Sequence, residues 1–218
     1  MKRTIGTAVT VAILASIFST SPALAADPKV KPPKCTKSKA VPHDPKRVAQ
    51  PTKSLKALPR TITFSTNCGN IVVETVGKKA PVTITSLTAL AKAGYFDQSI
   101  CHRLTTQGLF VLQCGDPTAS ASGSPTGWKG FVDENLPTGK VITYPAGTVA
   151  MANSGPNTNG SQIFFVFGDS TLQPNYTVWG KVISGLDILT SIASLGAVQP
   201  DGNGQYVYAG DGFPVQLV

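Results

Sequence analysis

The amino-acid sequence predicts a domain made mainly of β-strands with two α-helices, preceded by an N-terminal tail. Short apolar runs separated by turn residues continue from residue 60 to the C-terminus. The 218 residues include 21 Gly and 17 Pro, a content that favours a turn-rich, strand-based fold. Only two segments have the apolar spacing of a helix. Many short strands with two helices favour a closed barrel capped by the helices, although periodicity alone is also compatible with a sandwich.

The first predicted elements are a hairpin and a helix. Apolar residues alternate over residues 61–66 and return at 71–73, after a run of turn residues, which predicts two paired strands. A helix is predicted over residues 80–93, because Pro81 suits its first turn and Gly94 ends it.

The remaining elements alternate with polar loops. Residues 116–130 form a loop of small residues and glycine, and residues 186–195 have one apolar face and predict the second helix. Further strands are predicted over residues 100–104, 109–114, 148–152, 162–167, 177–182 and 215–218.

The net charge of +8 is concentrated near the N-terminus. Residues 26–60 hold ten basic and two acidic groups, whereas residues 61–218 hold seven basic and nine acidic groups. A basic tail can contact an anionic cell-envelope surface or nucleic acid, but a solvated, self-repelling linker has the same composition. We therefore expect no nucleic-acid partner, and we interpret residues 26–59, rich in proline and lysine, as a linker before a domain of residues 60–218.

The first 25 residues have the pattern of an export signal. Lys2 and Arg3 precede an apolar stretch that is short for a membrane span, and Ala23-Leu24-Ala25 has the small-x-small pattern of a cleavage site. We expect cleavage after Ala25 and a secreted or extracytoplasmic location. An uncleaved anchor is the alternative.

Four cysteines in an oxidising compartment suggest two disulfides. Cys101 and Cys114 flank the strand pair predicted over 100–104 and 109–114, so they could face each other across it. That pairing leaves Cys35 with Cys68, which would join the tail to the domain. Free buried thiols are the alternative. The sequence has no C-x-x-C pair and only two histidines, which argues against a zinc site.

The sequence lacks the common hydrolase, zinc-protease and nucleotide-binding motifs, but three segments carry polar residues among apolar strands. They are Cys101-His102-Arg103-Leu104, Phe110 to Asp116, and the polar turn from Met151 to Phe165. In order and spacing these segments resemble the signature segments of cyclophilin-type peptidyl-prolyl cis–trans isomerases, over nearly all of residues 60–218. The resemblance implies an eight-stranded antiparallel barrel capped by two helices, proline-containing polypeptides as partners, and no cofactor or metal. We also expect a monomer.

The resemblance also assigns roles to individual residues. Arg103 would be the cationic donor to a twisted X-Pro amide, supported by the catalytic residues Gln113 and Asn153. The substrate-binding residues would form an apolar cup for proline, hold the substrate backbone and border the groove; they are Phe110, Val111, Gly123, Ala152, Ser154, Gln162, Phe164, Leu172 and Tyr176. A non-catalytic proline-peptide binding module or chaperone on the same fold is the alternative function.

The sequence departs from the best-known cyclophilins in three places. The spacing between Arg103 and Gln113 is two residues longer, so the alignment of Phe110 and Val111 depends on counting back from Gln113. Thr171 and Tyr176 stand where those relatives carry a tryptophan and a histidine. Since that tryptophan contacts cyclosporin-type inhibitors in the family, we expect reduced sensitivity to them.

Overall fold

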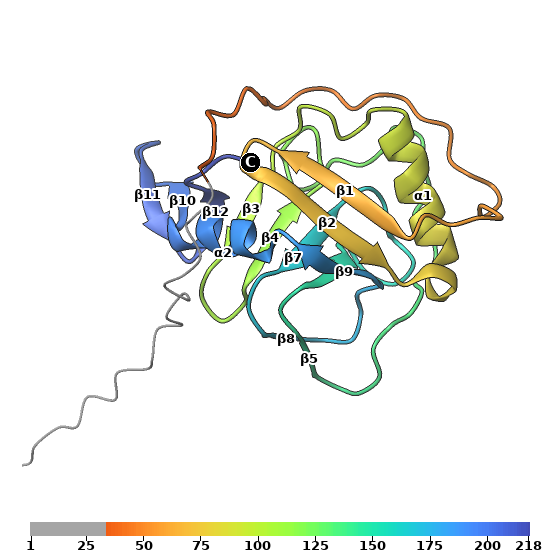
Figure 1. The fold of residues 1–218 in the computed structure, drawn as a ribbon. Coiled ribbons are helices and arrows are strands. Elements are labelled where there is room, and N and C mark those ends of the chain that lie inside the picture. Colours follow the sequence, from red (N-terminus) through yellow and green to blue (C-terminus); the bar gives the residue numbers. More distant parts are fainter. Residues whose placement is uncertain (1–33) are drawn as a thin grey trace, which may run out of the picture. The chain divides into compact units, whose positions relative to one another are not determined.

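The computed structural model describes residues 34–218, which belong to one compact unit (Figure 1). The predicted export signal and the first residues of the tail lie outside the described residues. In the described part, no helix is both long enough and apolar enough to cross a membrane.

The described residues form two α-helices, a 3-10 helix and twelve strands. The helices are α1 (Pro81–Lys92), α2 (Leu186–Ser194) and the 3-10 helix η1 (Gly77–Lys79). The strands are β1 (Thr61–Thr66), β2 (Gly69–Thr75), β3 (Arg103–Thr105), β4 (Val111–Cys114), β5 (Ile142–Tyr144), β6 (Thr148–Met151), β7 (Ile163–Val166), β8 (Ser170–Leu172), β9 (Val178–Ser184), β10 (Ala197–Pro200), β11 (Tyr206–Ala209) and β12 (Asp211–Pro214). Both helices were expected at these places from the sequence.

The prediction of a closed, eight-stranded barrel is wrong. Ten strands form one open sheet in the order β1-β2-β9-β6-β7-β4-β3-β12-β10-β11, and β5 and β8 form a separate pair. The mostly-β composition, the antiparallel pairing and the two helices agree with the sequence prediction.

The sheet stays open because the C-terminal residues do not pair with β1. The strand predicted over residues 215–218 was expected to close the sheet. Instead, the carbonyl of Val218 accepts a hydrogen bond from the amide of Cys101, and the carbonyl of Leu217 accepts one from Asn67 Nδ2. The outer edge of β1 therefore lacks a neighbouring strand among the described residues.

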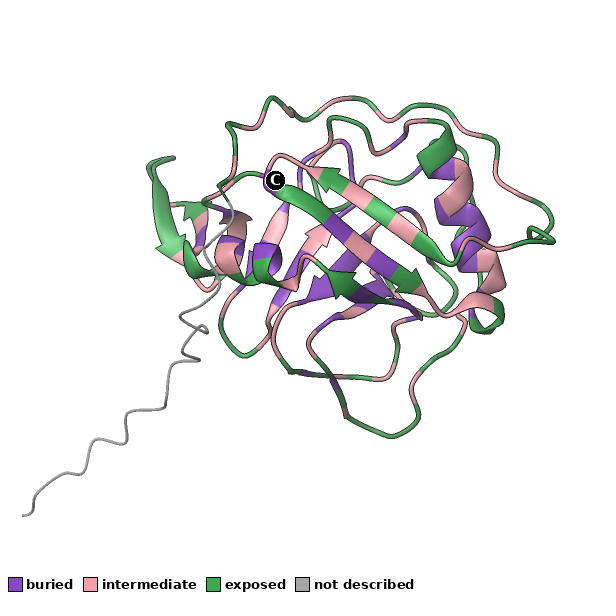
Figure 2. Cartoon of the chain, viewed as in Figure 1, coloured by how far each residue is buried: buried purple, intermediate pink, exposed green. Residues whose placement is uncertain are grey.

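The main core lies between the sheet and the helices (Figure 2). Trp179 and Phe165 are fully buried, and Phe64 packs edge-on against Phe165 with 5.1 Å between ring centroids. From α1, Ile84 and Leu87 enter the same cluster. Aromatic and aliphatic burial of this kind is the main favourable contribution to folding, about 25 cal/mol per Å² of apolar surface.

The first turn of α1 is capped by a carboxylate from a distant loop. Its N-cap residue, Ala80, offers no side-chain acceptor. Glu134 accepts hydrogen bonds from the amides of Val82 and Thr83, at 3.0 and 2.8 Å, and from the Thr83 hydroxyl. These bonds satisfy amides that a helix leaves free at its start, and the negative charge also suits the helix dipole.

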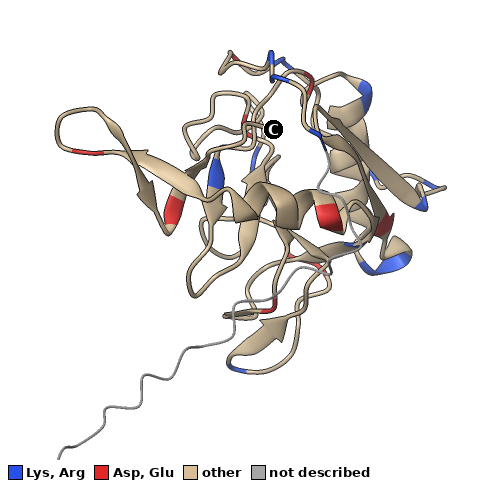
Figure 3. Ribbon diagram, turned by 60° about the vertical axis from the view of Figure 1, so that its left-hand side comes forward, with Lys and Arg blue, Asp and Glu red and all other residues tan. Residues whose placement is uncertain are grey.

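Residues 34–59 contain no helix or strand, yet they lie against the domain. The Trp128 indole donates to the carbonyl of Val48 at 2.7 Å, and the amide of Leu55 donates to Thr85 Oγ1 in α1. Farther back, the amide of His43 donates to the carbonyl of Pro117. We name residues 34–59 the strap. Its lysines and arginine are exposed. Figure 3 shows the charged residues of the described part of the chain.

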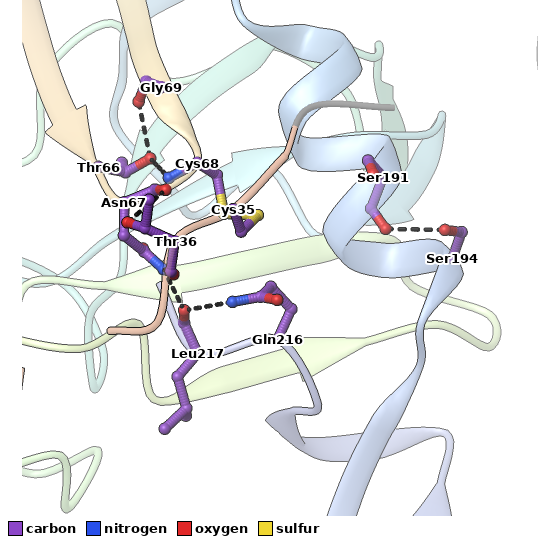
Figure 4. Close-up of a disulfide and its surroundings, with 10 residues drawn as sticks. All are labelled: Cys35, Thr36, Thr66, Asn67, Cys68, Gly69, Ser191, Ser194, Gln216 and Leu217. Carbon is purple, nitrogen blue, oxygen red and sulfur yellow. Dashed lines mark hydrogen bonds between the residues drawn. A yellow bond between two sulfur atoms is a disulfide. The ribbon is translucent and has the colours of Figure 1, made fainter. Parts of the chain in front are cut away.

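Both predicted disulfides are present. Cys35 is bonded to Cys68 and Cys101 to Cys114, and no free cysteine remains in the described residues. The first bond joins the strap to the β1–β2 turn, where Thr36 and Asn67 exchange further hydrogen bonds (Figure 4). The second joins the segment before β3 to the end of β4.

Removing the disulfides should destabilise the protein, and somewhat more for the bond that closes the longer loop. The bonds span 33 and 13 residues. Loop-closure entropy predicts a loss of about 4 kcal/mol for Cys35→Ser with Cys68→Ser, and about 3 kcal/mol for Cys101→Ser with Cys114→Ser. Denaturant titrations of both double variants provide the measurement. Losses below about 1 kcal/mol in both would contradict this expectation.

Candidate functional site

The candidate site is built on a row of three residues across neighbouring strands. Arg103 on β3 pairs directly with Gln113 on β4, and Gln113 pairs with Phe164 on β7. Residues directly opposite one another in antiparallel strands project from the same face of the sheet. The register therefore places a guanidinium, an amide and an aromatic ring side by side.

These residues line a small cleft of about 160 Å³. Leu109 and Val111 precede Gln113 on alternate positions of the same chain segment, so all three share a face. The lining residues combine one cation, polar amides and apolar side chains; they are Arg103, Leu109, Val111, Gln113, Ala152, Asn153, Phe164, Leu172 and Tyr176.

Aromatic rings form the floor and one rim of the cleft. Phe164 is 5% exposed and meets Tyr176 edge-on, with 5.4 Å between ring centroids. Tyr144 lies beside both rings at 6.3 to 6.4 Å. Leu172 reaches the cleft from β8, which pairs with β5 through Ile142. A planar, apolar ring can be buried against such a surface.

The structure brings together eight of the twelve residues that the resemblance assigned to catalysis or substrate binding. Phe110, Gly123, Ser154 and Gln162 do not line the cleft, and Phe110 instead packs against Phe167 with 6.0 Å between ring centroids. Strand alternation explains this, because Phe110 lies between the two inward positions Leu109 and Val111. Leu109 occupies the place in the cup that was expected for Phe110.

Arg103 is held by a residue that the sequence did not single out. Its Nε and Nη2 donate to the two carboxylate oxygens of Asp211, at 2.8 and 2.6 Å. This bidentate pair raises the pKa of the Arg103 guanidinium further above its ordinary value. The guanidinium therefore carries its charge at every working pH.

The two glutamines bond to each other rather than to Arg103. Gln113 Nε2 donates to Gln162 Oε1 at 2.7 Å, and Gln162 Nε2 donates to the carbonyls of Ala121 and Gly123. This chain of amides connects the cleft to the loop of residues 116–130. Gln162 thus supports the site from behind Gln113.

The loop bearing Gly123 is held by a buried carboxylate. Asp116 accepts hydrogen bonds from the hydroxyl of Thr118 at 2.7 Å, and from the amides of Gly123 and Thr118, both at 2.9 Å. Burial works against ionisation of Asp116, but these bonds outweigh it and lower the pKa of the carboxyl group. A Cβ at Gly123 would collide with this carboxylate, so the loop requires glycine there.

Asn153 lies at the start of the polar turn that follows β6. Its side-chain Nδ2 donates to the carbonyl of Asn175 at 2.8 Å, and its Oδ1 accepts from the amide of Gly155. These bonds fix the side chain. Its backbone N–H and C=O have no hydrogen-bond partner among residues 34–218 and are available to a bound peptide.

His102 is buried behind the site, 4% exposed, and neither ring nitrogen has a hydrogen-bond partner in the described part of the chain. Burial lowers the pKa of His102, and the negative charge of Asp116 offsets part of this effect. The neutral imidazole is therefore the stable form. His102 does not line the cleft, which agrees with a structural role.

A larger hollow of about 820 Å³ lies at the open edge of the sheet, between β1 and the start of the strap. Its charged groups are Lys37, Lys39 and Asp97, and it contains no guanidinium beside an apolar cup. Among residues 34–218, no three His, Cys, Asp or Glu side chains gather to hold a metal ion. The smaller cleft is thus the better candidate for chemistry.

Comparison with known proteins decides the family. The family model "Cyclophilin type peptidyl-prolyl cis-trans isomerase/CLD" matches residues 61–208, the part of the chain that forms the cleft. The chain belongs to the cyclophilin family. Its mostly antiparallel fold is also similar to a crystal structure of a Cryptosporidium parvum cyclophilin-type isomerase, with a TM-score of 0.55 and 26% identity over 73% of this chain and 96% of that one.

Two curated relatives match different shares of this cyclophilin and of their own length. A probable peptidyl-prolyl cis-trans isomerase B of Mycobacterium tuberculosis is 40% identical over 78% of this chain and 54% of its own length. The isomerase-like 3 protein of Rattus norvegicus is 39% identical over 62% of this chain and 83% of its own. The chain thus spans about half the length of the mycobacterial relative.

The buried His102 should make stability depend on pH. Its pKa is lowered on folding, so the unfolded state binds a proton first as the pH falls below 6.5. The free energy of unfolding should decrease from that pH downward, by at most about 1.4 kcal/mol per pH unit. Denaturant titrations between pH 7.5 and pH 5 should give a flatter profile for His102→Gln than for the wild type. Equal slopes would show that His102 is not the group responsible.

Proposed function

We propose that this cyclophilin is a peptidyl-prolyl cis–trans isomerase that accelerates X-Pro rotation in exported proteins. The observation that carries the proposal is the position of the Arg103 guanidinium at an apolar cleft floored by Phe164. A charged donor beside a surface that fits a proline ring is what the reaction requires.

The chemistry needs no nucleophile and no change of charge on the enzyme. Rotation about an X-Pro bond breaks amide resonance, at a cost of about 18–20 kcal/mol, and takes on the order of tens to hundreds of seconds in free chains. In the twisted amide the nitrogen becomes pyramidal and more basic. Arg103 can donate a hydrogen bond to that nitrogen, which stabilises the transition state more than the planar ground state.

Positioning must supply part of the acceleration. Each 1.4 kcal/mol or so removed from the barrier gives a tenfold gain, so one hydrogen bond gives only a fraction of a millionfold effect. Val111, Phe164 and Leu172 would hold the ring, while the backbone of Asn153 would pair with the peptide. When the proline ring and the peptide backbone are both held, rotation about the X-Pro bond is the main motion left to the substrate.

A related structure supports a proline-containing ligand. The Cryptosporidium parvum cyclophilin was also crystallised in the presence of the dipeptide Ala-Pro, and this chain is 25% identical to it, with a TM-score of 0.54. From this resemblance we expect the cleft of this chain to bind an X-Pro dipeptide unit. A non-catalytic binding module would use the same apolar residues but would not need Arg103.

Export is part of the proposal. The two disulfides are compatible with an extracytoplasmic location, and they agree with the export signal expected over residues 1–25. The exposed cations of the strap would face an anionic cell envelope. The clients would be proline-containing polypeptides, and the domain would act as a monomer.

Arg103→Ala should reduce kcat/KM by about 100-fold in a protease-coupled assay with an X-Pro tetrapeptide, because the donor to the twisted amide is lost. Arg60→Ala is the control, since it removes the same charge from an exposed side chain that makes no hydrogen bond or ion pair within residues 34–218. The control should keep the wild-type rate. Equal rates for Arg103→Ala and Arg60→Ala would remove Arg103 as the catalyst.

Cyclosporin-type inhibitors should bind weakly. Thr171 is exposed on β8, next to Leu172 of the cleft, where the resemblance places a tryptophan. Thr171→Trp should tighten inhibition by about tenfold, because it adds an indole donor and apolar area at the rim. Inhibition constants for the wild type and the variant provide the measurement. Wild-type inhibition as tight as in tryptophan-bearing relatives would contradict this expectation.

A further inference from the structure

The bidentate contact between Arg103 and Asp211 was not predicted by any motif in the sequence. It is the only salt bridge in the described part of the chain. Asp211 does not line the cleft itself, whereas Arg103 does. The carboxylate therefore acts on Arg103 from outside the space that a substrate would occupy.

The sheet register explains how Asp211 reaches Arg103. Asp211 on β12 pairs directly with Thr105 on β3, and Gly212 pairs with Leu104. Arg103 is two residues from Thr105 and is thus the diagonal neighbour of Asp211 on the same face, within reach of a long side chain. A further backbone bond, from the amide of Thr106 to the carbonyl of Gly210 at 2.8 Å, holds this end of β12.

No other side chain in residues 34–218 accepts a hydrogen bond from Arg103. Gln113 lies directly opposite but donates to Gln162 instead. The guanidinium has five N–H donors, of which Nε–H and one on Nη2 point to Asp211. Three donors remain for a substrate, and the planar fork fixes their directions once two are bound.

We propose that Asp211 is the positioning residue for Arg103, taking the supporting part that the resemblance assigned to Gln113. This inference rests on the proposed function. The two side chains are 39% and 52% exposed, so the contact contributes little to stability and acts mainly by holding one orientation of the guanidinium. Without it, Arg103 would sample several rotamers in solvent, and few of them would present a donor to the cleft.

The test compares Asp211→Asn with Glu74→Gln in the wild type and in an Arg103→Ala background. Glu74 is an exposed carboxylate on β2, far from β12 in the strand order, and its side chain makes no hydrogen bond within residues 34–218. Both substitutions remove one negative charge and keep the side-chain size. Protease-coupled kinetics at several substrate concentrations separate kcat from KM.

Asp211→Asn should lower kcat about two- to fivefold with little change in KM, which is the range expected for losing an exposed charged pair. Glu74→Gln should have no effect. In the Arg103→Ala background, Asp211→Asn should cause no further loss. The NMR signal of Arg103 Nε–H should also shift and exchange faster with water in Asp211→Asn, and stay unchanged in Glu74→Gln.

Three results would overturn the inference alone: an unchanged or raised kcat in Asp211→Asn, an equal loss in both backgrounds, or an unaltered Nε–H signal. In each case Arg103→Ala would still be impaired. An inactive wild type, or an Arg103→Ala variant at the full rate, would instead overturn the proposed function, and the inference would fall with it.

Discussion

The register of the β3–β4–β7 ladder is the constraint on which the site depends. Pairing of Arg103 with Gln113, and of Gln113 with Phe164, sets a charged, a polar and an apolar group on one face. A slip of one residue would turn every one of these side chains to the other face. The fully buried Leu104 and Leu112, which pair with each other on the opposite face, hold this register by packing into the core.

One disulfide and one ion pair reinforce that ladder, and a second disulfide joins the strap to the β1–β2 turn. The Cys101–Cys114 bond ties the approach to β3 to the end of β4, and the Arg103–Asp211 pair ties β3 to β12. The Cys35–Cys68 bond adds the strap, which is also fixed by Trp128 and Thr85. The positively charged strap is thus part of the folded unit rather than a chain that moves independently of it, and any anionic surface it meets would meet the domain as well.

Local sequence patterns were sufficient for the helices, for most strands and for the Cys101–Cys114 disulfide, because these depend on neighbouring residues and on hairpin geometry. The Cys35–Cys68 disulfide followed by elimination, since these were the two cysteines that remained. They failed where distant segments decide the outcome. Closure of the barrel depends on where residues 215–218 lie. Glu134 caps helix α1 and Asp211 binds Arg103, and both carboxylates lie far along the chain from their partners. Phe110 was placed in the cup by counting, whereas strand alternation puts Leu109 there. No sequence pattern indicated Asp211, because the strand that carries it, β12 over residues 211–214, was not predicted.

Exchange spectroscopy by NMR on an Ala-Pro peptide tests the central claim most directly, because it separates binding from catalysis in one sample. With a catalytic amount of the protein, cross-peaks between the cis and trans forms should appear, and with saturating peptide the backbone signals of Val111, Asn153 and Phe164 should shift. Shifts at these residues without exchange between the two forms would contradict the account, because the cleft would then bind proline without accelerating its rotation.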